Sequence, residues 1–258
     1  MKLFDNTILI TGGGSGIGRG LAEAFHTLGN KVIIAGRRKP ALDAVTDSNP
    51  GMASVVLDID DPDAIRSFAA EAGKHFPTLN VLINNAGIMR PENLKAQKLA
   101  DAEAIITTNL LGPVRLTAAL LPHLRKQSGS AVINVSSGLA FVPFPVTPTY
   151  SATKAALHSY TVSLRVQLQG TSVDVVEIIP PAVATDLTPG RSTDDLRMMS
   201  VQDYIAETMQ ILKTQPTPIE VNVEGVKSLR FAEATGTYDK ALQMLSQIRL
   251  PSDTETKS

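Results

Sequence analysis

Residues 7–18 read TILITGGGSGIG, and this stretch decides the fold. A short aliphatic run ends in glycines, and a helical pattern follows over residues 17–28. Glycines let backbone N–H groups approach a pyrophosphate closely, and the positive end of a helix dipole favours its negative charge. The stretch therefore predicts a strand, a loop and a helix that hold a dinucleotide. A glycine-rich turn without a ligand is the alternative interpretation.

The same alternation of apolar strands and helices continues along the chain. The expected strands are residues 7–10, 31–35, 54–57, 81–83, 131–135 and 173–178. The expected helices are residues 17–28, 40–46, 62–76, 99–126 and 150–169. Most of these strands are rich in Val and Ile without strict alternation, which is typical of a parallel sheet with helices on both faces. The order predicts an α/β fold, a single-domain Rossmann-like doubly wound parallel sheet.

The chain shows no linker and no repeat, so one domain is expected over residues 1–250. A polar, disordered tail is expected over residues 251–258. Residues 219–233 look helical, with Gly236 as the stop, and the sequence therefore predicts no final strand.

The composition excludes several classes of protein. The 258 residues include 24 Lys and Arg against 25 Asp and Glu, a net charge of −1, and no cysteine. A nucleic-acid binder usually carries a basic surface, and without cysteine there is no disulfide, thiolate metal site or cysteine nucleophile. The longest uncharged stretch, residues 127–153, contains three prolines, so no membrane span is expected. The four histidines do not cluster, so we expect no metal. The lack of cysteine fits a reducing compartment, and we expect a cytoplasmic protein.

A second group of residues carries the candidate chemistry. Tyr150 and Lys154 are four residues apart on an expected helix, so both side chains share one face. A free phenol, with a pKa near ~10, is a poor acid–base group at neutral pH, and a neighbouring ammonium lowers that pKa. Ser137 ends an expected strand 13 residues before Tyr150. Pro113 lacks an N–H and so frees the carbonyl oxygen of Asn109 in mid-helix.

Together these elements resemble the short-chain dehydrogenase/reductase family. The resemblance rests on the glycine loop, on Asn84-Asn85-Ala86-Gly87 after the fourth strand, and on Tyr150-x-x-x-Lys154. It implies an NAD(P)-dependent enzyme that transfers a hydride between nicotinamide and a ketone or secondary alcohol. In that scheme Tyr150 is the acid–base group and Ser137 orients the carbonyl. Lys154 lowers the pKa of the tyrosine and binds ribose, while Asn109 holds a relay water.

The resemblance also implies a set of cofactor contacts. They are Gly12, Ser15, Gly16, Ile17, Gly18, Arg37, Arg38, Asp58, Ile59, Asn85, Ala86, Gly87, Tyr150, Lys154, Pro180, Val183 and Thr185. Pro181 stands where the family has glycine, which removes one backbone donor. An acidic residue after the second strand would select NAD, but Arg37 and Arg38 stand there and suit a 2′-phosphate. We therefore expect NADP(H) to be preferred, with NAD(H) possible. Two solvated surface arginines are the alternative.

Substrate and assembly follow from the remaining segments. Residues 138–149 and 186–215 are expected to line the substrate side; the second segment carries Leu187, Leu196, Met198, Met199 and Tyr204. Neither segment shows a basic cluster, which favours a hydrophobic small-molecule ketone or alcohol. Without a final strand we expect a homodimer paired through residues 99–126 and 150–169. The stretch EVNVEGVKSLRFAEATG resembles the DltE-type oxidoreductase subgroup. A non-catalytic NADP-binding sensor and a sugar epimerase are the alternative functions.

Overall fold

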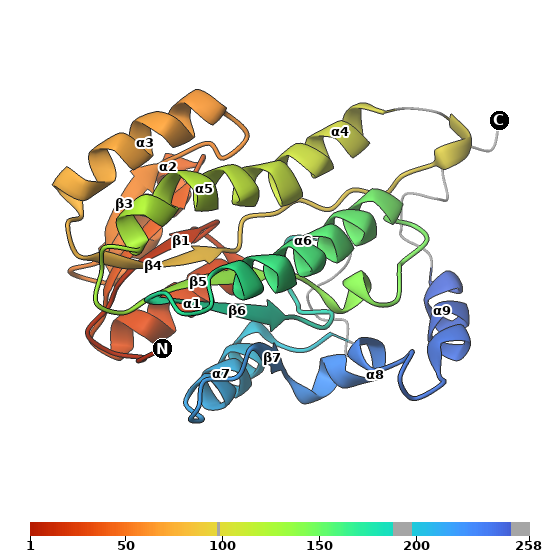
Figure 1. Cartoon of the computed structure of the whole chain (residues 1–258). Coiled ribbons are helices and arrows are strands. Elements are labelled where there is room, and N and C mark those ends of the chain that lie inside the picture. Colours follow the sequence, from red (N-terminus) through yellow and green to blue (C-terminus); the bar gives the residue numbers. More distant parts are fainter. Residues whose placement is uncertain (97–98, 188–197, 249–258) are drawn as a thin grey trace.

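The computed structural model describes residues 1–96, 99–187 and 198–248. The strands in these residues form a parallel sheet in the order β3-β2-β1-β4-β5-β6-β7 (Figure 1). The strands are β1 Thr7–Thr11, β2 Lys31–Gly36, β3 Ala53–Val56, β4 Leu79–Asn84, β5 Ser130–Val135, β6 Val173–Ile179 and β7 Glu220–Asn222. The order reverses on the two sides of β1, as in a doubly wound fold. The expected Rossmann-like architecture is confirmed.

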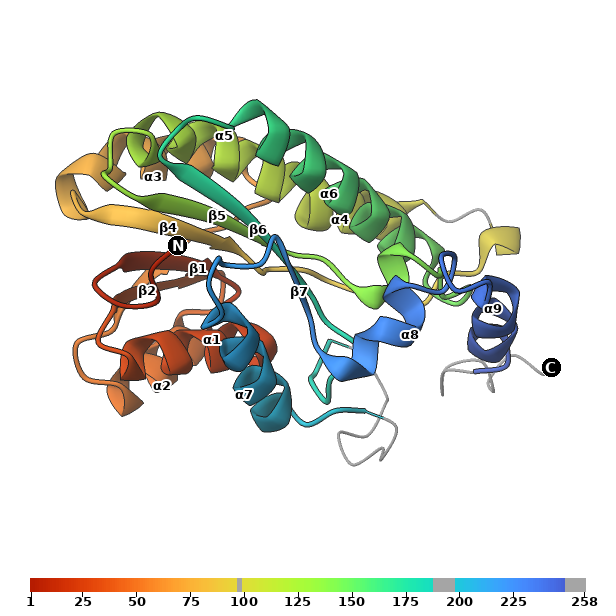
Figure 2. The ribbon, with the colours of Figure 1, turned by 60° about the horizontal axis from the view of Figure 1, so that its bottom comes forward.

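Helices cover both faces of this sheet. They are α1 Gly16–Thr27, α2 Lys39–Ser48, α3 Pro62–His75, α4 Ala100–Ile106, α5 Gly112–Leu124, α6 Pro148–Gln167, α7 Val201–Leu212, α8 Lys227–Arg230 and α9 Tyr238–Ser246. Figure 2 shows α3, α4, α5 and α6 on one face and α1, α2 and α7 on the other. The last two helices, α8 and α9, lie beyond the carboxyl end of β6 (Figure 2). The candidate site must therefore be sought where the strands end between these layers.

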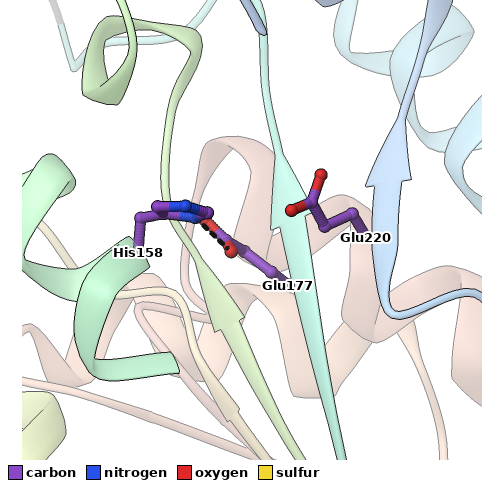
Figure 3. A group of neighbouring side chains, drawn as sticks. All are labelled: His158, Glu177 and Glu220. Atoms are coloured by element: carbon purple, nitrogen blue, oxygen red, sulfur yellow. Dashed lines mark hydrogen bonds and ion pairs between the residues drawn. The ribbon is translucent and has the colours of Figure 1, made fainter. Parts of the chain in front are cut away.

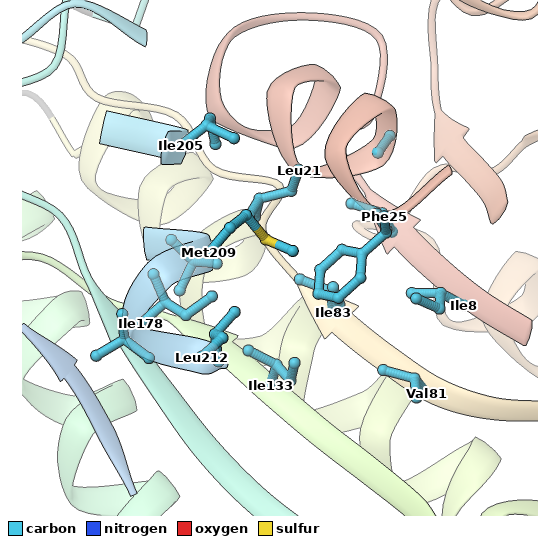
Figure 4. Packing of buried hydrophobic residues seen from close by; sticks show 14 of the residues in the cluster. Ile8, Leu21, Phe25, Val81, Ile83, Ile133, Ile178, Ile205, Met209 and Leu212 are labelled. Atoms are coloured by element: carbon cyan, nitrogen blue, oxygen red, sulfur yellow. The ribbon is translucent and has the colours of Figure 1, made fainter. Parts of the chain in front are cut away.

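Two apolar clusters explain why the strands read as continuous hydrophobic runs. In β1, Ile8 and Ile10 belong to the cluster under α1 and α7, which Figure 4 shows with Phe25 and Met209. Leu9, between them in the sequence, belongs to the cluster on the opposite face. Successive side chains of a strand point to opposite faces, and here both faces are buried.

The chain after α7 differs from the sequence-based expectation. Residues 219–233 were expected to be helical, but Glu220–Asn222 forms β7, which pairs in parallel with β6. Only Glu224–Val226, a 3-10 turn named η4, and α8 are helical within that range. Val221 and Val223 are fully buried and alternate with polar residues, which is strand periodicity. Three residues are too few for the pattern to stand out in the sequence.

The expected helix over residues 99–126 is divided into three parts. A π-helical segment, η2 Thr107–Leu111, separates α4 from α5. By length and composition the run Ala100–Leu124 is apolar enough to cross a membrane, but a core helix passes the same test. Its α5 part packs against α3 and β4, which is the environment of a core helix.

Part of the expected substrate side belongs to the core instead. Tyr204 on α7 is completely buried in the cluster between α7 and the sheet, as is Leu212. They close the fold over β6 and do not line a cleft. Leu196 and the tail over residues 251–258 lie outside the described residues.

Candidate active site

A cleft of about 530 Å³ lies at the carboxyl ends of the strands. All the expected cofactor-binding residues line it, together with Ser137. Asn109 is not among the lining residues, because its side chain is completely buried behind them. Ligands of doubly wound sheets bind in this position, outside the carboxyl ends of the strands. The motifs identified in the sequence are therefore brought to one place.

A larger cleft, of about 670 Å³, lies at the opposite end of the sheet. It is lined by residues from the amino-terminal segment, including Lys2 and Asp5, and by Asp174 and Lys213. The amino group of Met1 forms an ion pair with Asp174 there, at 2.9 Å. This cleft is lined neither by the glycine loop nor by Ser137, Tyr150 or Lys154. The volume of a cleft therefore does not identify the active site.

The glycine loop is shaped by contacts that only glycine permits. Gly12 has a φ of +68°, and a Cβ on Gly18 would lie 2.3 Å from the carbonyl oxygen of Gly12. The same Cβ would lie 2.4 Å from Nδ2 of Asn85, which donates to the carbonyl oxygen of Thr11 at 2.9 Å. A plain turn does not require this close packing of three backbone segments. The loop thus leaves the N-terminus of α1 open toward the cleft, which fits a pyrophosphate.

The Asn-Asn-Ala-Gly element braces the loop from the neighbouring strand. The hydroxyl of Thr11 accepts hydrogen bonds from the backbone N–H groups of Asn85 and Ala86, at 3.0 and 3.1 Å. Asn84, one residue earlier, donates to Asn134 on β5 at 2.8 Å. These bonds link β1, β4 and β5 at the floor of the cleft.

Arg37 and Arg38 stand at the end of β2, on the rim of the cleft. Arg37 is about half exposed and pairs with Asp60 at 3.3 Å. Arg38 donates to the hydroxyl of Ser15 at 3.4 Å, which places a guanidinium beside the glycine loop. Planar donors at this position suit a phosphate on the adenosine ribose.

Tyr150 projects from the first turn of α6 and is 5% exposed. Burial raises its pKa to about 12, and a hydrogen bond with the Ser137 side chain opposes that rise. Ser137 also accepts a hydrogen bond from the N–H of Leu139 at 3.1 Å, which caps the 3-10 turn η3 Gly138–Ala140. Ser137 is thus a capping residue and a partner of Tyr150 at once.

Lys154 lies one turn further along α6. Its Nζ is 5.6 Å from the centre of the Tyr150 ring and donates to the carbonyl oxygen of Val135 at 2.8 Å. Burial lowers the pKa of Lys154 to about 8, and the charge of Glu177 acts in the opposite direction. The lysine is therefore much easier to deprotonate than an exposed one.

Asn109 occupies a π-helical segment just before Pro113, where the sequence predicts an interruption of the helical hydrogen bonds. The N–H of Gly112 reaches back five residues to the carbonyl oxygen of Thr107, so the regular ladder is interrupted there. The Asn109 amide pairs twice with the backbone of Ile88, both at 2.8 Å, which fixes the loop after β4. A Cβ on Gly87 would lie 3.2 Å from Asn109 Oδ1 and 3.8 Å from Lys154 Nζ, so this glycine keeps the two close.

Thr185 follows β6 and faces the glycine loop. A Cβ on Gly16 would lie 3.2 Å from its methyl group. Its hydroxyl accepts a hydrogen bond from the N–H of Leu187 at 3.4 Å. Pro180 and Val183 line the same wall of the cleft. The expected cofactor contacts after β6 thus lie opposite the glycine loop, although Pro181 offers no N–H there.

A family model described as short chain dehydrogenase matches residues 6–196. The chain belongs to the short-chain dehydrogenase family. It is 39% identical over 252 residues to the uncharacterized oxidoreductase DltE of Bacillus subtilis (strain 168), a match that covers 95% of this chain and 98% of the relative. The expected family, the likeness to the DltE-type subgroup and the assignment as an enzyme of this family are confirmed.

Solved structures of other short-chain dehydrogenases share the fold. One from Burkholderia cenocepacia J2315, in complex with NADP, has a TM-score of 0.79 at 25% identity, with 96% of this chain and 100% of that chain covered. A 3-ketoacyl-(acyl-carrier-protein) reductase from Brucella melitensis, complexed with NADH, has a TM-score of 0.76 at 27% identity, with 87% and 98% covered. Both cofactor types therefore occur among the structural neighbours of this short-chain dehydrogenase.

Around Tyr150 the expected Leu187 is joined by residues that the sequence analysis did not name. Tyr150 packs in a small cluster with the buried Met89 and Ile105, and Ile88 and Leu187 pack against it. Glu92 accepts hydrogen bonds from the N–H and the hydroxyl of Thr149, at 2.9 and 2.6 Å, at the start of α6. The position of Ile88 and Met89 directly after the Asn-Asn-Ala-Gly element could have indicated that they lie near the site. No local sequence pattern indicates the contact between Glu92 and Thr149.

Proposed function

We propose that this protein is an NADP-dependent oxidoreductase that transfers a hydride between nicotinamide and a hydrophobic ketone or secondary alcohol. One observation carries the proposal. Ser137, Tyr150 and Lys154 meet in the cleft that the glycine loop opens, and Ser137 and Tyr150 share a hydrogen bond. A dinucleotide site and an acid–base pair are thus combined in a single cavity.

Tyr150 is the proton donor in the direction of reduction. With a pKa raised to about 12 by burial, its hydroxyl carries a proton at neutral pH and can give it to a carbonyl oxygen. Ser137 donates a hydrogen bond to that oxygen and fixes its position beside the phenol. When bound, the nicotinamide supplies or accepts the hydride. Lys154, at 5.6 Å from the ring, stabilises the phenolate that proton transfer leaves.

Asn109 and Lys154 support a route for the returning proton. The π-helical turn interrupts the regular helical hydrogen bonds around Asn109, and Gly87 leaves room between Asn109 and Lys154. A water held there would connect the ammonium with solvent, as the family resemblance implies.

The preference for NADP rests on this chain's own arginines, because the neighbours bind either cofactor. Arg38 lies beside Ser15 of the glycine loop, and Arg37 is exposed on the same rim. The only acid paired with them in the described residues is Asp60, at 3.3 Å from Arg37. Two donors on the rim favour a 2′-phosphate.

The outer face of α4, η2 and α6 supports the homodimer. Ile106, Leu111, Val162 and Val166 are 37–59% exposed on these elements, although they are large and apolar. The argument from a missing final strand is lost, because β7 is present. The dimer therefore rests on this apolar face. A cytoplasmic location remains a proposal from the cysteine-free composition.

A panel of hydrophobic ketones, assayed with NADPH and with NADH, tests the function. Tyr150→Phe should retain NADPH binding, measured by nucleotide fluorescence, and lose about 10²–10⁴-fold in kcat, because the proton donor is removed. Tyr160→Phe is the matched control, since it removes a hydroxyl further along the same helix, outside the residues that line the cleft. Unchanged turnover in Tyr150→Phe would contradict the mechanism. NADPH binding without turnover of any ketone would favour the sensor.

A further inference from the structure

A charged cluster lies beneath α6, one turn beyond the candidate catalytic residues. It joins His158 of α6, Glu177 of β6, Glu220 of β7 and Arg230 of α8. Figure 3 shows His158 and Glu177 bonded to each other, with Glu220 projecting toward them from the neighbouring strand. Glu177 is completely buried, and its Oε1 has no hydrogen-bond partner among the described residues. A buried carboxylate is stable only beside compensating positive charge or donors.

A metal ion is not the best partner for this cluster. The ligand atoms of His158, Glu177 and Glu220 lie within 4.8 Å of one another, as in a cation site. However, Arg230 donates to both carboxylate oxygens of Glu220, at 2.8 and 2.9 Å. The guanidinium already compensates Glu220, and a divalent cation would have to displace it. Glu177, bonded only to the imidazole at 2.8 Å, remains the carboxylate without a permanently charged hydrogen-bond partner.

Lys154 is placed to compensate Glu177 together with Arg230, whose pKa is raised by its hydrogen bond with Glu220 and also by the charge of Glu177. Lys154 and His158 are four residues apart and share the inner face of α6. The Lys154 ammonium is anchored on the carbonyl oxygen of Val135, whose strand β5 pairs with β6 in the register Asn134 to Glu177. The charge of Glu177 raises the pKa of Lys154 against the effect of burial.

The surroundings of the two groups contain few other charges. Tyr150 and His158 face them from α6, Glu220 from β7 and Arg230 from α8. Arg230 pairs with Glu220 and partly offsets its charge. Of the acids in the described residues, Glu177 is the one whose charge raises the pKa of the lysine.

We propose that Glu177 is a positioning residue of the reaction, a buried carboxylate that keeps Lys154 in its cationic form, with His158 fixing its orientation. The proposal rests on the role of Lys154 in the proposed function. A neutral lysine would not stabilise the phenolate of Tyr150, and it could not give a charged hydrogen bond to a ribose hydroxyl. Glu177 thus extends the acid–base machinery to a strand that carries none of the family motifs.

The decisive experiment titrates Lys154 without any substrate. In protein labelled with ¹³C at the lysine ε-carbon, the Lys154 signal is assigned by its loss in Lys154→Arg, and its shift is followed from pH 6 to 11. Glu177→Gln, which keeps the shape and removes the charge, should lower the titration midpoint of Lys154 by about one pH unit or more. An unchanged midpoint in the folded variant would overturn the proposal, because a purely structural glutamate does not move it.

Glu220→Gln is the matched control, since it removes a carboxylate of the same cluster whose charge Arg230 already compensates. The titration midpoint of Lys154 in Glu220→Gln should stay well above the midpoint in Glu177→Gln, and equal midpoints in the two variants would overturn the proposal. If Glu177→Gln does not fold, Glu177→Asp replaces it. That variant withdraws the carboxylate by one methylene group and should lower the midpoint by a smaller amount, whereas an unchanged value would again contradict the proposal.

The kinetic consequence is a shift of the pH profile. The alkaline limb of kcat/KM for ketone reduction should move to lower pH in Glu177→Gln by the same amount as the lysine midpoint. The lysine titration needs neither cofactor nor substrate, so it remains readable if no ketone is turned over. Failure of the proposed function and failure of the role of Glu177 are therefore distinguishable.

Discussion

Replacing Lys154 with Met should make the cofactor-free protein more stable at neutral pH. Lys154 is 4% exposed, and burial lowers its pKa from 10.5 to about 8. In the unfolded chain the lysine keeps its ordinary pKa. Below pH 8 both states carry the charge, and the folded state therefore bears the whole cost of burying it. The pKa of about 8 already includes the attraction of Glu177, so the cost is a net one, and methionine, with a similar shape and no charge, removes it.

The magnitude follows from the difference of about 2.5 pH units between the two states. At about 1.4 kcal/mol per unit, the charged form of Lys154 lowers the free energy of unfolding by about 3 kcal/mol at pH 7. The variant also loses the hydrogen bond to the carbonyl oxygen of Val135, which offsets about 1–2 kcal/mol. The net gain should be about 1–2 kcal/mol.

The sign of the pH dependence provides a second check. Between pH 8 and 10.5 the folded lysine loses its proton while the unfolded one retains it, so the wild-type protein gains stability as the pH rises. The advantage of Lys154→Met should therefore shrink across this window. Urea unfolding followed by far-ultraviolet circular dichroism at pH 7 and pH 10 measures both effects.

A control and a refuting result complete the test. Lys74→Met removes a lysine that is 77% exposed, and it should change the free energy of unfolding by less than about 0.5 kcal/mol at either pH. The reasoning is refuted if Lys154→Met is less stable than wild type at pH 7, or if its advantage is the same at both values of pH. Whatever the effect on stability, Lys154→Met should lose turnover, because it lacks the ammonium group of Lys154.

The remaining predictions concern the cofactor. Arg37→Asp should shift the ratio of kcat/KM for NADPH over NADH by about 10–100-fold toward NADH, since it replaces a charge-assisted donor by a repelling carboxylate; an unchanged ratio in parallel assays would contradict the role of Arg37. Gly18→Ala should weaken NADPH binding, measured by fluorescence titration, by at least about tenfold, because its Cβ would lie 2.3 Å from the carbonyl oxygen of Gly12. Gly129→Ala, at a glycine with no positive φ and no atom within 4 Å of the added Cβ, is the control for loss of a glycine, and equal losses in both variants would contradict the argument.

The predictable helices and strands are those whose apolar sequence pattern extends over more than three or four residues. Strands β1 to β6 and the helices between them carry continuous apolar runs or helical spacing, and their observed bounds lie within a few residues of the expected ones. Strand β7 was missed because three residues show too little periodicity. Its existence depends on pairing with the edge of β6, which is a long-range contact.

The predicted site residues came together because each motif follows a strand, and parallel strands end at one edge of the sheet. The interruption at Asn109 was predictable, since Pro113 lacks the donor that a regular helix requires there, but its π-helical form was not. Glu92 was not readable: its bond to the start of α6 joins residues 57 apart, and nothing in the local sequence indicates it.

The burial of Glu177 was predictable from its place inside a strand that is buried on both faces. The run VDVVEII was interpreted as a strand buried on both faces, and the strand is indeed buried at every residue except Asp174. A glutamate inside such a strand is almost never fully buried without a partner. The partner had to come from a neighbouring element, and the helix that carries Tyr150 and Lys154 presents His158 at the next position of the same spacing. Burial of the strand and the four-residue spacing together thus indicate a charge network that neither pattern indicates alone, and this network extends from the family motifs to residues outside them.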